Sequence, residues 1–362
     1  MRNSFPVNMQ EGQTTSGMIP LNEFHPVSEL VVSEHLIKKA KHPVIDAHNH
    51  LRLRSTGDST PEDLISEMDR FNIRLIVDLD GHSGGGVEQQ LKRFVEPYPD
   101  RFTLFLQYDI SDIDSPDFAY QIRSLTKKYC ERGISGIKFL KWLGLRYKDK
   151  NGIFIKPDDD RLKPIWESAA RYDLPVTIHI ADPIAFFKPI TPENERYEEL
   201  FEHPHWSFAD PRFYRFEELM ESQERLLEKN PDTRYIVAHV GSNSENLKRV
   251  GQLLDKYPNM FVDTAERIAD LGRQPYSSRE FLIKYQDRVL YGTDLLPNET
   301  NVSGNYRFFE TMDEYFTYNS LEEHNQGRWY IYGVGLPDEV LQKIYFKNAL
   351  KVIPKLRAFY HE

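Results

Sequence analysis

The chain has 362 residues, 40% of them hydrophobic and 13% aromatic, so it is long enough to bury a large core. Its formal net charge of −10 and pI near 5.7 argue against the clustered Lys and Arg surface that nucleic acids and anionic membranes require. A small-molecule substrate is therefore the expected partner. Cys130 is the only cysteine, which excludes an internal disulfide.

The first 42 residues differ in character from the rest. The opening twenty are polar and lack the apolar core of a signal peptide, and no apolar run approaches the roughly 18 residues that a membrane span needs. An amphipathic stretch from Val27 to Lys41 predicts a helix. We expect a tail and lead-in helix over 1–42, one domain over 43–362 and a cytoplasmic protein. The sequence leaves open whether the chain forms a homo-oligomer.

From Pro43 onward, short apolar runs alternate with longer segments of helical period, which is typical of repeated βα units. The runs are rich in Val, Ile and Leu, as expected of strands covered on both faces. Eight of them predict a (β/α)8 barrel of the TIM type. They are Pro43 to His48, Arg74 to Asp80, Phe102 to Asp109, Ile134 to Leu140, Pro175 to Asp182, Arg234 to Gly241, Met260 to Glu266, and Arg288 to Asp294.

Helix starts and two insertions complete this pattern. Thr60 before Pro61 predicts a capped helix, and Pro337 marks the start of the last one. Extra segments follow the fifth and eighth strands, at Pro183 to Pro211 and Leu295 to Leu336. Because the loops after barrel strands form the face that carries chemistry, these insertions are expected to wall the substrate pocket.

Polar residues end four of the apolar runs. His48 and His50 point to one side of the first strand, because side chains alternate along a strand. His179, His239 and Asp294 end the fifth, sixth and eighth runs. Singly, each is more simply a satisfied core histidine or a helix cap. Together they would leave several buried polar groups without partners, so a shared cation is the simpler explanation.

This set of motifs resembles the amidohydrolase superfamily. The motifs are Asp46-Ala47-His48-Asn49-His50, Gly136-Ile137-Lys138, Thr177-Ile178-His179, Val237-Ala238-His239-Val240-Gly241 and Tyr291-Gly292-Thr293-Asp294. They resemble in particular the amidohydrolase-related branch that includes carboxymuconate-semialdehyde and resorcylate-type decarboxylases. The resemblance runs over about residues 43–350 and implies a metal-dependent barrel enzyme.

The resemblance also implies roles for single residues. His48, His50, His179 and Asp294 would bind the metal, and Asp294 would also act as a base. His239 would be a catalytic acid, base or electrophile. Three imidazoles and one carboxylate suit one divalent ion, with Zn²⁺ as the first choice and Mn²⁺ or Fe²⁺ as alternatives. Such an ion would activate water and polarise a carbonyl group.

Further residues are candidates for substrate contact. Lys138 lies in an apolar strand, so it is predicted to contact a substrate carboxylate, to form a structural ion pair or, if carboxylated, to bridge two metals. His82 follows the second strand, and Glu266 and Arg267 follow the seventh. Trp206, in the first insertion, could stack on a substrate or hold its loop on the barrel.

Asp46 lies one step deeper on the first strand than the histidines. It is predicted to be a hydrogen-bond acceptor behind the ligands or a residue of the barrel core, rather than a ligand itself.

Three functions follow from these residues. The leading interpretation is a hydrolase that uses metal-activated water on a C–N or C–O bond of an amide, ester or lactone. The alternative is a metal-dependent, non-oxidative decarboxylase of an aromatic or dienyl carboxylate. The third is a binding barrel without turnover, which the intact ligand set disfavours.

Overall fold

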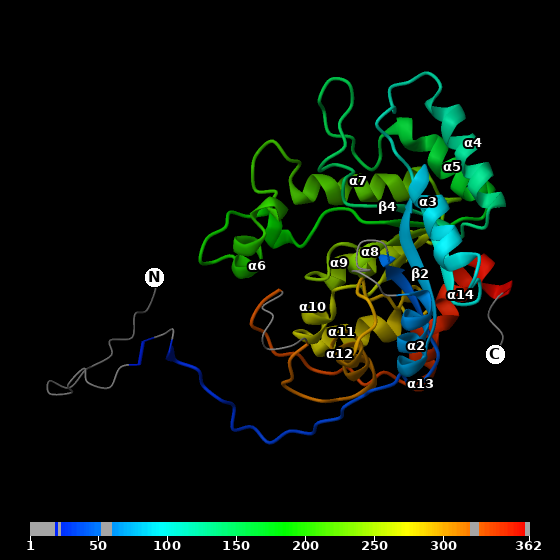
Figure 1. Ribbon diagram of the computed structural model, residues 1–362. Coiled ribbons are helices and arrows are strands. Elements are labelled where there is room, and N and C mark those ends of the chain that lie inside the picture. Colours follow the sequence, from blue (N-terminus) through cyan, green and yellow to red (C-terminus); the bar gives the residue numbers. More distant parts are fainter. Residues whose placement is uncertain (1–18, 21–22, 52–59, 319–325, 359–362) are drawn as a thin grey trace. The chain divides into compact units, whose positions relative to one another are not determined.

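The computed structural model describes residues 19–20, 23–51, 60–318 and 326–358 (Figure 1). The chain divides into two units, with the boundary between Ser33 and Glu34. The prediction of a helix over Val27 to Lys41 is wrong, because residues 24–41 contain no helix. Val27 and Val31 are 83% and 100% exposed. An amphipathic helix gains most of its stability by packing its apolar face, and this segment buries too little to offset the cost of helix nucleation.

Eight parallel strands form one sheet in which each strand pairs with the next along the chain. The predicted (β/α)8 barrel is therefore confirmed. The observed strands are mostly shorter than the apolar runs that predicted them, especially at their carboxyl ends. They are β1 (Val44–Asn49), β2 (Ile73–His82), β3 (Phe102–Gln107), β4 (Gly136–Phe139), β5 (Val176–Ile178), β6 (Tyr235–Val237), β7 (Met260–Asp263) and β8 (Val289–Leu290).

Backbone hydrogen bonds between the first and last strand segments close the barrel. Ala47 N donates to Tyr291 O at 2.9 Å, and Asp294 N donates to His48 O at 2.8 Å. Asp46 supports this seam, as its buried carboxylate accepts hydrogen bonds from the backbone N and the hydroxyl of Thr293. The carboxylate of Asp46 thus holds the strand of His48 against the segment that carries Asp294.

Helices follow the strands and surround the sheet (Figure 1). The predicted cap is present at the first: Thr60 accepts from Asp63 N, and Pro61 is the first helical residue. The α-helices of the repeat are α2 (Pro61–Phe71), α3 (Gly85–Gln90), α4 (Phe118–Glu131), α5 (Lys163–Arg171), α7 (Phe216–Lys229), α9 (Leu247–Lys256), α10 (Ile268–Gly272), α11 (Pro275–Lys284), α13 (Asp338–Gln342) and α14 (Asn348–Val352).

Both segments predicted as insertions carry short elements of their own. The segment after β5 contains η4 (Ile184–Phe187), α6 (Tyr197–Glu202) and η5 (Pro204–Trp206). The segment after β8 contains α12 (Glu299–Glu310) and an isolated bridge between Phe316 and Ile331. These elements stand beside the carboxyl ends of the strands, where the main cavity opens.

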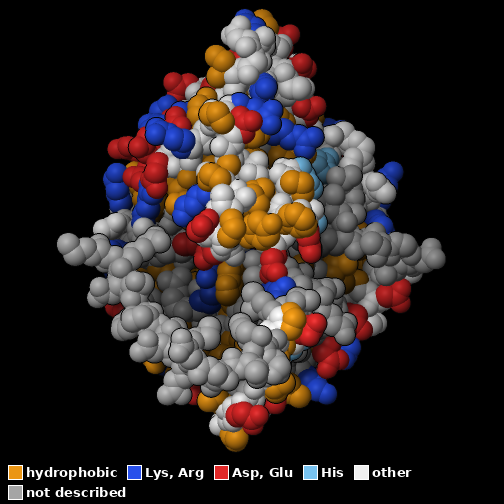
Figure 2. Space-filling view, turned by 90° about the vertical axis from the view of Figure 1, so that its left-hand side faces the viewer, with side chains coloured by type: hydrophobic (Ala, Val, Ile, Leu, Met, Phe, Trp, Pro, Cys, Tyr) orange, Lys and Arg blue, Asp and Glu red, His pale blue; other side chains and the backbone are white. Residues whose placement is uncertain are grey.

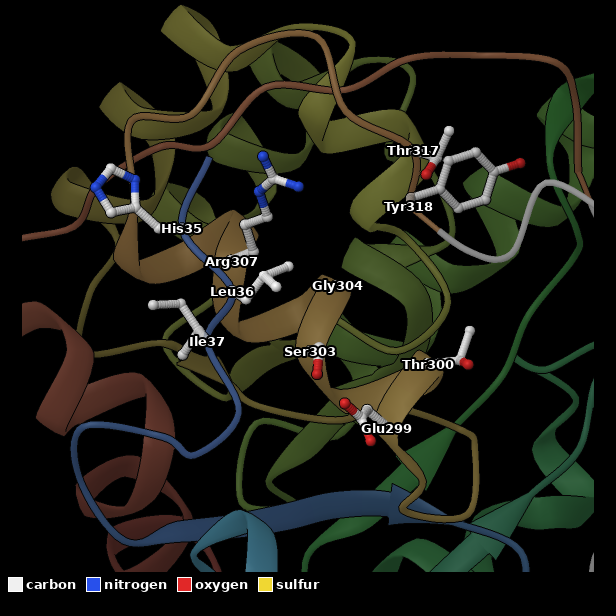
Figure 3. Close-up of a pocket in the computed structure, with 10 residues that line it drawn as sticks. All are labelled: His35, Leu36, Ile37, Glu299, Thr300, Ser303, Gly304, Arg307, Thr317 and Tyr318. Atoms are coloured by element: carbon white, nitrogen blue, oxygen red, sulfur yellow. The ribbon is translucent and has the colours of Figure 1, made fainter. Parts of the chain in front are cut away.

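A small cavity of about 230 Å³ lies where residues 35–37 run along α12 (Figure 3). Asp313 fastens this segment, since it accepts from the backbone N and ring Nδ1 of His35 at 2.7 and 2.5 Å. Arg307 Nε, from α12, donates to the same carboxylate at 2.7 Å. The segment before β1 is therefore attached to α12 through Asp313, without forming a helix.

Candidate active site and metal centre

A cavity of about 590 Å³ opens at the carboxyl ends of the strands, and polar side chains make up most of its wall. Of the four predicted metal ligands, His179 and Asp294 line it, and so does His239, which was predicted as a catalytic residue. The described lining residues are Lys141, His179, Asp182, Pro183, Phe186, Arg196, Glu199, Glu202, His203, Trp206, His239, Glu266, Arg267, Asp294, Leu295, Asn298, Asn301 and Gln326.

Asp263, the last residue of β7, fixes two of the histidines. Its carboxylate accepts from His48 Nδ1 at 2.8 Å and from the backbone N of His239 at 2.9 Å. A carboxylate only accepts, so His48 carries its proton on Nδ1. The lone pair of His48 Nε2 is thereby left for a cation or a donor.

Two further histidines are held in the same way. His50 Nδ1 lies 2.8 Å from Asp80 Oδ1, and His239 Nδ1 donates to Ala265 O at 2.9 Å. Both rings therefore keep Nε2 as the unprotonated atom when neutral. His179 differs, since its Nε2 is buried and, within the described part of the chain, forms no hydrogen bond. Acceptors behind imidazoles are the usual support of metal-binding histidines.

The candidate ligand atoms converge around Asp294. One atom each of His48, His239 and Asp294 lies within 4.8 Å of the others. Asp294 Oδ2 is 4.0 Å from His48 Nε2, and Asp294 Oδ1 is 3.9 Å from His50 Nε2. The ring centres of His179 and His239 are 4.2 Å apart. All five predicted residues thus form one cluster, and His48, His239 and Asp294 are its tightest group.

Left-handed backbone directs two of these side chains. His239 and Val240 have φ values of 58° and 56°, and Asp294 has a φ of 61°. Such values are uncommon outside glycine and rare for a β-branched residue such as Val240. The strands β6 and β8 therefore end before His239 and Asp294, and each side chain follows a sharp turn instead of strand alternation. The apolar runs in the sequence contain no signal for these turns.

Burial favours the neutral form of three imidazoles of this cluster, those of His48, His179 and His239. Burial lowers the pKa of His179 to about 4, although Asp182 opposes the shift. Burial likewise lowers the pKa of His48 and of His239, with Lys138 adding to the effect at His48 and His179 adding to it at His239. Neutral imidazole is the form that binds a metal ion.

Lys138 points inward from β4 and is fully buried. Its Nζ lies 3.1 Å from His48 Nε2, and burial lowers the pKa of its ammonium to about 8. The carboxylates of Asp263, Asp294 and Asp80 act in the opposite direction. Lys138 therefore lies beneath the histidine cluster and is not among the residues that line the cavity.

Of the other predicted substrate-binding residues, three line the cavity and one does not. Glu266, Arg267 and Trp206 line the cavity, whereas His82, at the end of β2, is not among its lining residues. Trp206 stacks on His203 with ring centres 4.1 Å apart. One face of this indole is therefore occupied within its own loop.

Sequence reasoning missed several residues of this site. Asp80 ends the second predicted run and Asp263 lies inside the seventh, and a carboxylate in an apolar run was a signal that could have been used as it was for Asp294. Lys141, Asp182 and Arg196 also line the cavity. Lys141 and Arg196 lie in connecting segments, where the pattern of apolar residues gives no side-chain direction, whereas Asp182 ends the fifth predicted run.

A barrel with a histidine and aspartate cluster at the carboxyl ends of its strands defines the class of metal-dependent TIM-barrel enzymes. The amidohydrolase family model matches residues 45–355, so the chain belongs to the amidohydrolase family. The resemblance inferred from the motifs is confirmed, and so, at the level of the family, is the prediction of an enzyme of this type. No protein with a curated description matches the sequence.

Solved structures share this fold at low sequence identity. A 2,6-dihydroxybenzoate decarboxylase bound to 2,6-dihydroxybenzoate is 15% identical with a TM-score of 0.55, covering 86% of this chain and 99% of that one. A dihydroxybenzoic acid decarboxylase from a Polaromonas species, with manganese and 2-nitroresorcinol, is also 15% identical with a TM-score of 0.55. The match covers 86% of this chain and 97% of that one. A putative amidohydrolase from Staphylococcus aureus is 17% identical with a TM-score of 0.53, and the match covers 86% of this chain and 99% of that one.

Among the helices that the structure describes, none combines the length and the apolar character needed to cross a bilayer. The described part of the face in Figure 2 mixes basic, acidic and hydrophobic side chains without a continuous basic area.

Proposed function

We propose that this protein is a metal-dependent carboxy-lyase that removes CO2 from a small unsaturated or aromatic carboxylate. The observation that carries the proposal is the convergence of neutral histidines and Asp294 beneath a polar cavity of about 590 Å³. Two of the similar structures are decarboxylases of dihydroxybenzoates, and one of these holds manganese. Decarboxylation thus has more support than the hydrolysis that we favoured from the sequence.

The donor set fits a divalent ion. Two ligand atoms bound tetrahedrally at about 2.1 Å lie roughly 3.4 Å apart, and the 3.9 and 4.0 Å separations around Asp294 need only a small contraction. The buried Nε2 of His179 also lacks a hydrogen bond among the described residues. We assign His48, His50, His179 and Asp294 as ligands of one ion, and Mn²⁺, Zn²⁺ and Fe²⁺ all suit this set.

The ion would supply Lewis acidity and would balance the charge of an anionic substrate. The chain supplies the proton transfer. Asp294 has 17% of its side chain exposed to the cavity, which lets its carboxyl group exchange protons with solvent. As the C–C bond breaks and CO2 leaves, the carbon takes the proton held by Asp294. Asp263 and Ala265 hold His239 by hydrogen bonds, so that its Nε2 stays near the Asp294 carboxyl group.

The experiment that tests this function is CO2 release from a panel of hydroxybenzoates and dienyl carboxylates. The purified protein should be loaded in turn with Mn²⁺, Zn²⁺ and Fe²⁺, and metal content measured in parallel. We expect metal-dependent CO2 release that falls by about 10²-fold or more in Asp294→Asn. Metal-loaded protein that releases no CO2 from any member of the panel would contradict the proposal.

Hydrolysis of an amide, ester or lactone is the second candidate. It is favoured by the position of the Asp294 carboxylate, about equidistant from His48 Nε2 and His50 Nε2, where it could take a proton from water and pass it to a leaving group. Assaying the same metal-loaded protein on a panel of such substrates separates the two reactions. A cytoplasmic location remains a prediction.

A further inference from the structure

Lys141 is a cation of the cavity wall that the proposed chemistry does not use. It lies two residues after the end of β4, and 27% of its side chain is exposed. Its Nζ donates to Asp182 Oδ2 at 2.5 Å, and no second hydrogen bond of this Nζ occurs within the described residues. An ammonium group has three donors, so Lys141 retains capacity to bind an anion.

The other two basic residues of the described cavity wall, Arg196 and Arg267, also have partners and are much less exposed than Lys141. Arg196 is 1% exposed and donates to Asp270 at 3.0 Å and to Glu199 at 3.2 Å. Arg267 is 7% exposed and donates to Glu266 O at 2.8 Å. Lys141 is therefore the cation best placed to meet a ligand.

The surroundings of Lys141 hold its ammonium beside the candidate metal centre. Asp182, which accepts from it, also has its Oδ1 3.5 Å from His179 Nε2. The ammonium lies 5.7 and 5.8 Å from the ring centres of Trp206 and Phe208. Aromatic walls reduce competition from water, so an ion pair formed here is stronger than one at an open surface.

We propose that Lys141 binds a second acidic group of the substrate, one that is retained in the reaction, and that the substrate therefore carries two acidic groups. The inference rests on the proposed function because it concerns the same cavity. A cation on the departing carboxylate would stabilise the reactant, whose charge is lost in the transition state, and would slow the reaction. On a retained group it binds reactant and transition state alike and lowers KM. Asp182 is the positioning residue of this ammonium.

The test compares matched mono- and dicarboxylates as ligands of the metal-loaded, full-length protein, by calorimetry. The pairs are benzoate and isophthalate, butyrate and glutarate, and pentanoate and adipate. We expect at least one dicarboxylate to bind ~10-fold or more tightly than its partner. Lys141→Met should abolish that preference and leave monocarboxylate affinity within about twofold, and Lys141→Arg should restore most of it. Lys188→Met is the control, since Lys188 is exposed and does not line the cavity.

Each outcome decides the matter. The proposal is overturned if the wild-type protein shows no preference in any pair, or if the preference survives Lys141→Met. It is also overturned if the variant weakens both members of a pair equally, which would indicate a structural role. If Lys141→Met does not fold, Lys141→Gln keeps a donor for Asp182 without the charge. A failure of the proposed function would look different, with the dicarboxylate preference intact and metal-dependent turnover absent.

Discussion

Asp263→Asn tests whether the carboxylate behind the histidines prepares the metal site. Asp263 accepts from His48 Nδ1 at 2.8 Å, from His239 N at 2.9 Å and from Ala265 N at 3.2 Å. An asparagine offers one oxygen and turns its NH2 group toward at least one of these N–H donors. The change should lower metal affinity about 10- to 100-fold, which is about 1.4–2.7 kcal/mol, since the rings lose their fixed orientation.

The same substitution leaves a buried donor unpaired, so the free energy of unfolding of the metal-free protein should fall by about 1–3 kcal/mol. Metal affinity is measured by competition with a fluorescent chelator, and stability by urea unfolding in chelator. Asp255→Asn is the matched control, because Asp255 is 58% exposed and should change stability by less than about 0.5 kcal/mol. If metal affinity stayed within twofold of wild type while stability fell, Asp263 would have no role in positioning the ligands.

Three further outcomes are expected. The pKa of Asp182 is lowered to about 2, because Lys141 and His179 outweigh the effect of burial. The contribution of the Asp182 carboxylate to the stability of the folded protein is therefore complete above about pH 4 and declines as the pH falls. The wild type should therefore lose about 1 kcal/mol more than Asp182→Asn between pH 6 and pH 3 in urea unfolding, and parallel pH profiles would contradict this pairing. Thr293→Val removes a hydrogen bond to Asp46 and should cost about 2 kcal/mol, whereas the exposed control Thr300→Val should cost almost nothing. Adding Mn²⁺ or Zn²⁺ at 100 times its Kd to chelator-treated protein should raise Tm by roughly 3–4 °C, and an unchanged Tm would argue against a resident ion.

The sequence was informative about strands because their burial on both faces produces continuous apolar runs. It also pointed to five polar residues that the structure brings into one cluster, because together they would leave several buried polar groups without partners. The pairing of His48 with Asp263 was beyond reach, as it joins residues 215 positions apart whose meeting depends on barrel closure. The direction of His239 could not be read either, because it depends on backbone turns that strand alternation does not describe.

The lead-in segment shows the opposite error, because there the sequence pattern predicts a helix that does not form. Val27 to Lys41 has a helical pattern, yet a pattern states only which residues could share a face and not whether anything covers that face. The extended course of residues 35–37 along α12 depends instead on the carboxylate of Asp313, nearly 280 residues away in the chain. Local periodicity carries no information about such a partner.

The seam between β1 and the segment after β8 has a consequence for how the chain is made. The Thr293 hydroxyl and the Asp46 carboxylate are separated by 247 residues, so a ribosome must synthesise almost the whole domain before this contact can form. Until then the first strand, with both of its histidines, has only β2 as a neighbour in the sheet. Ring closure is therefore expected to be a late step of folding, and the ion site can be assembled only when it is complete.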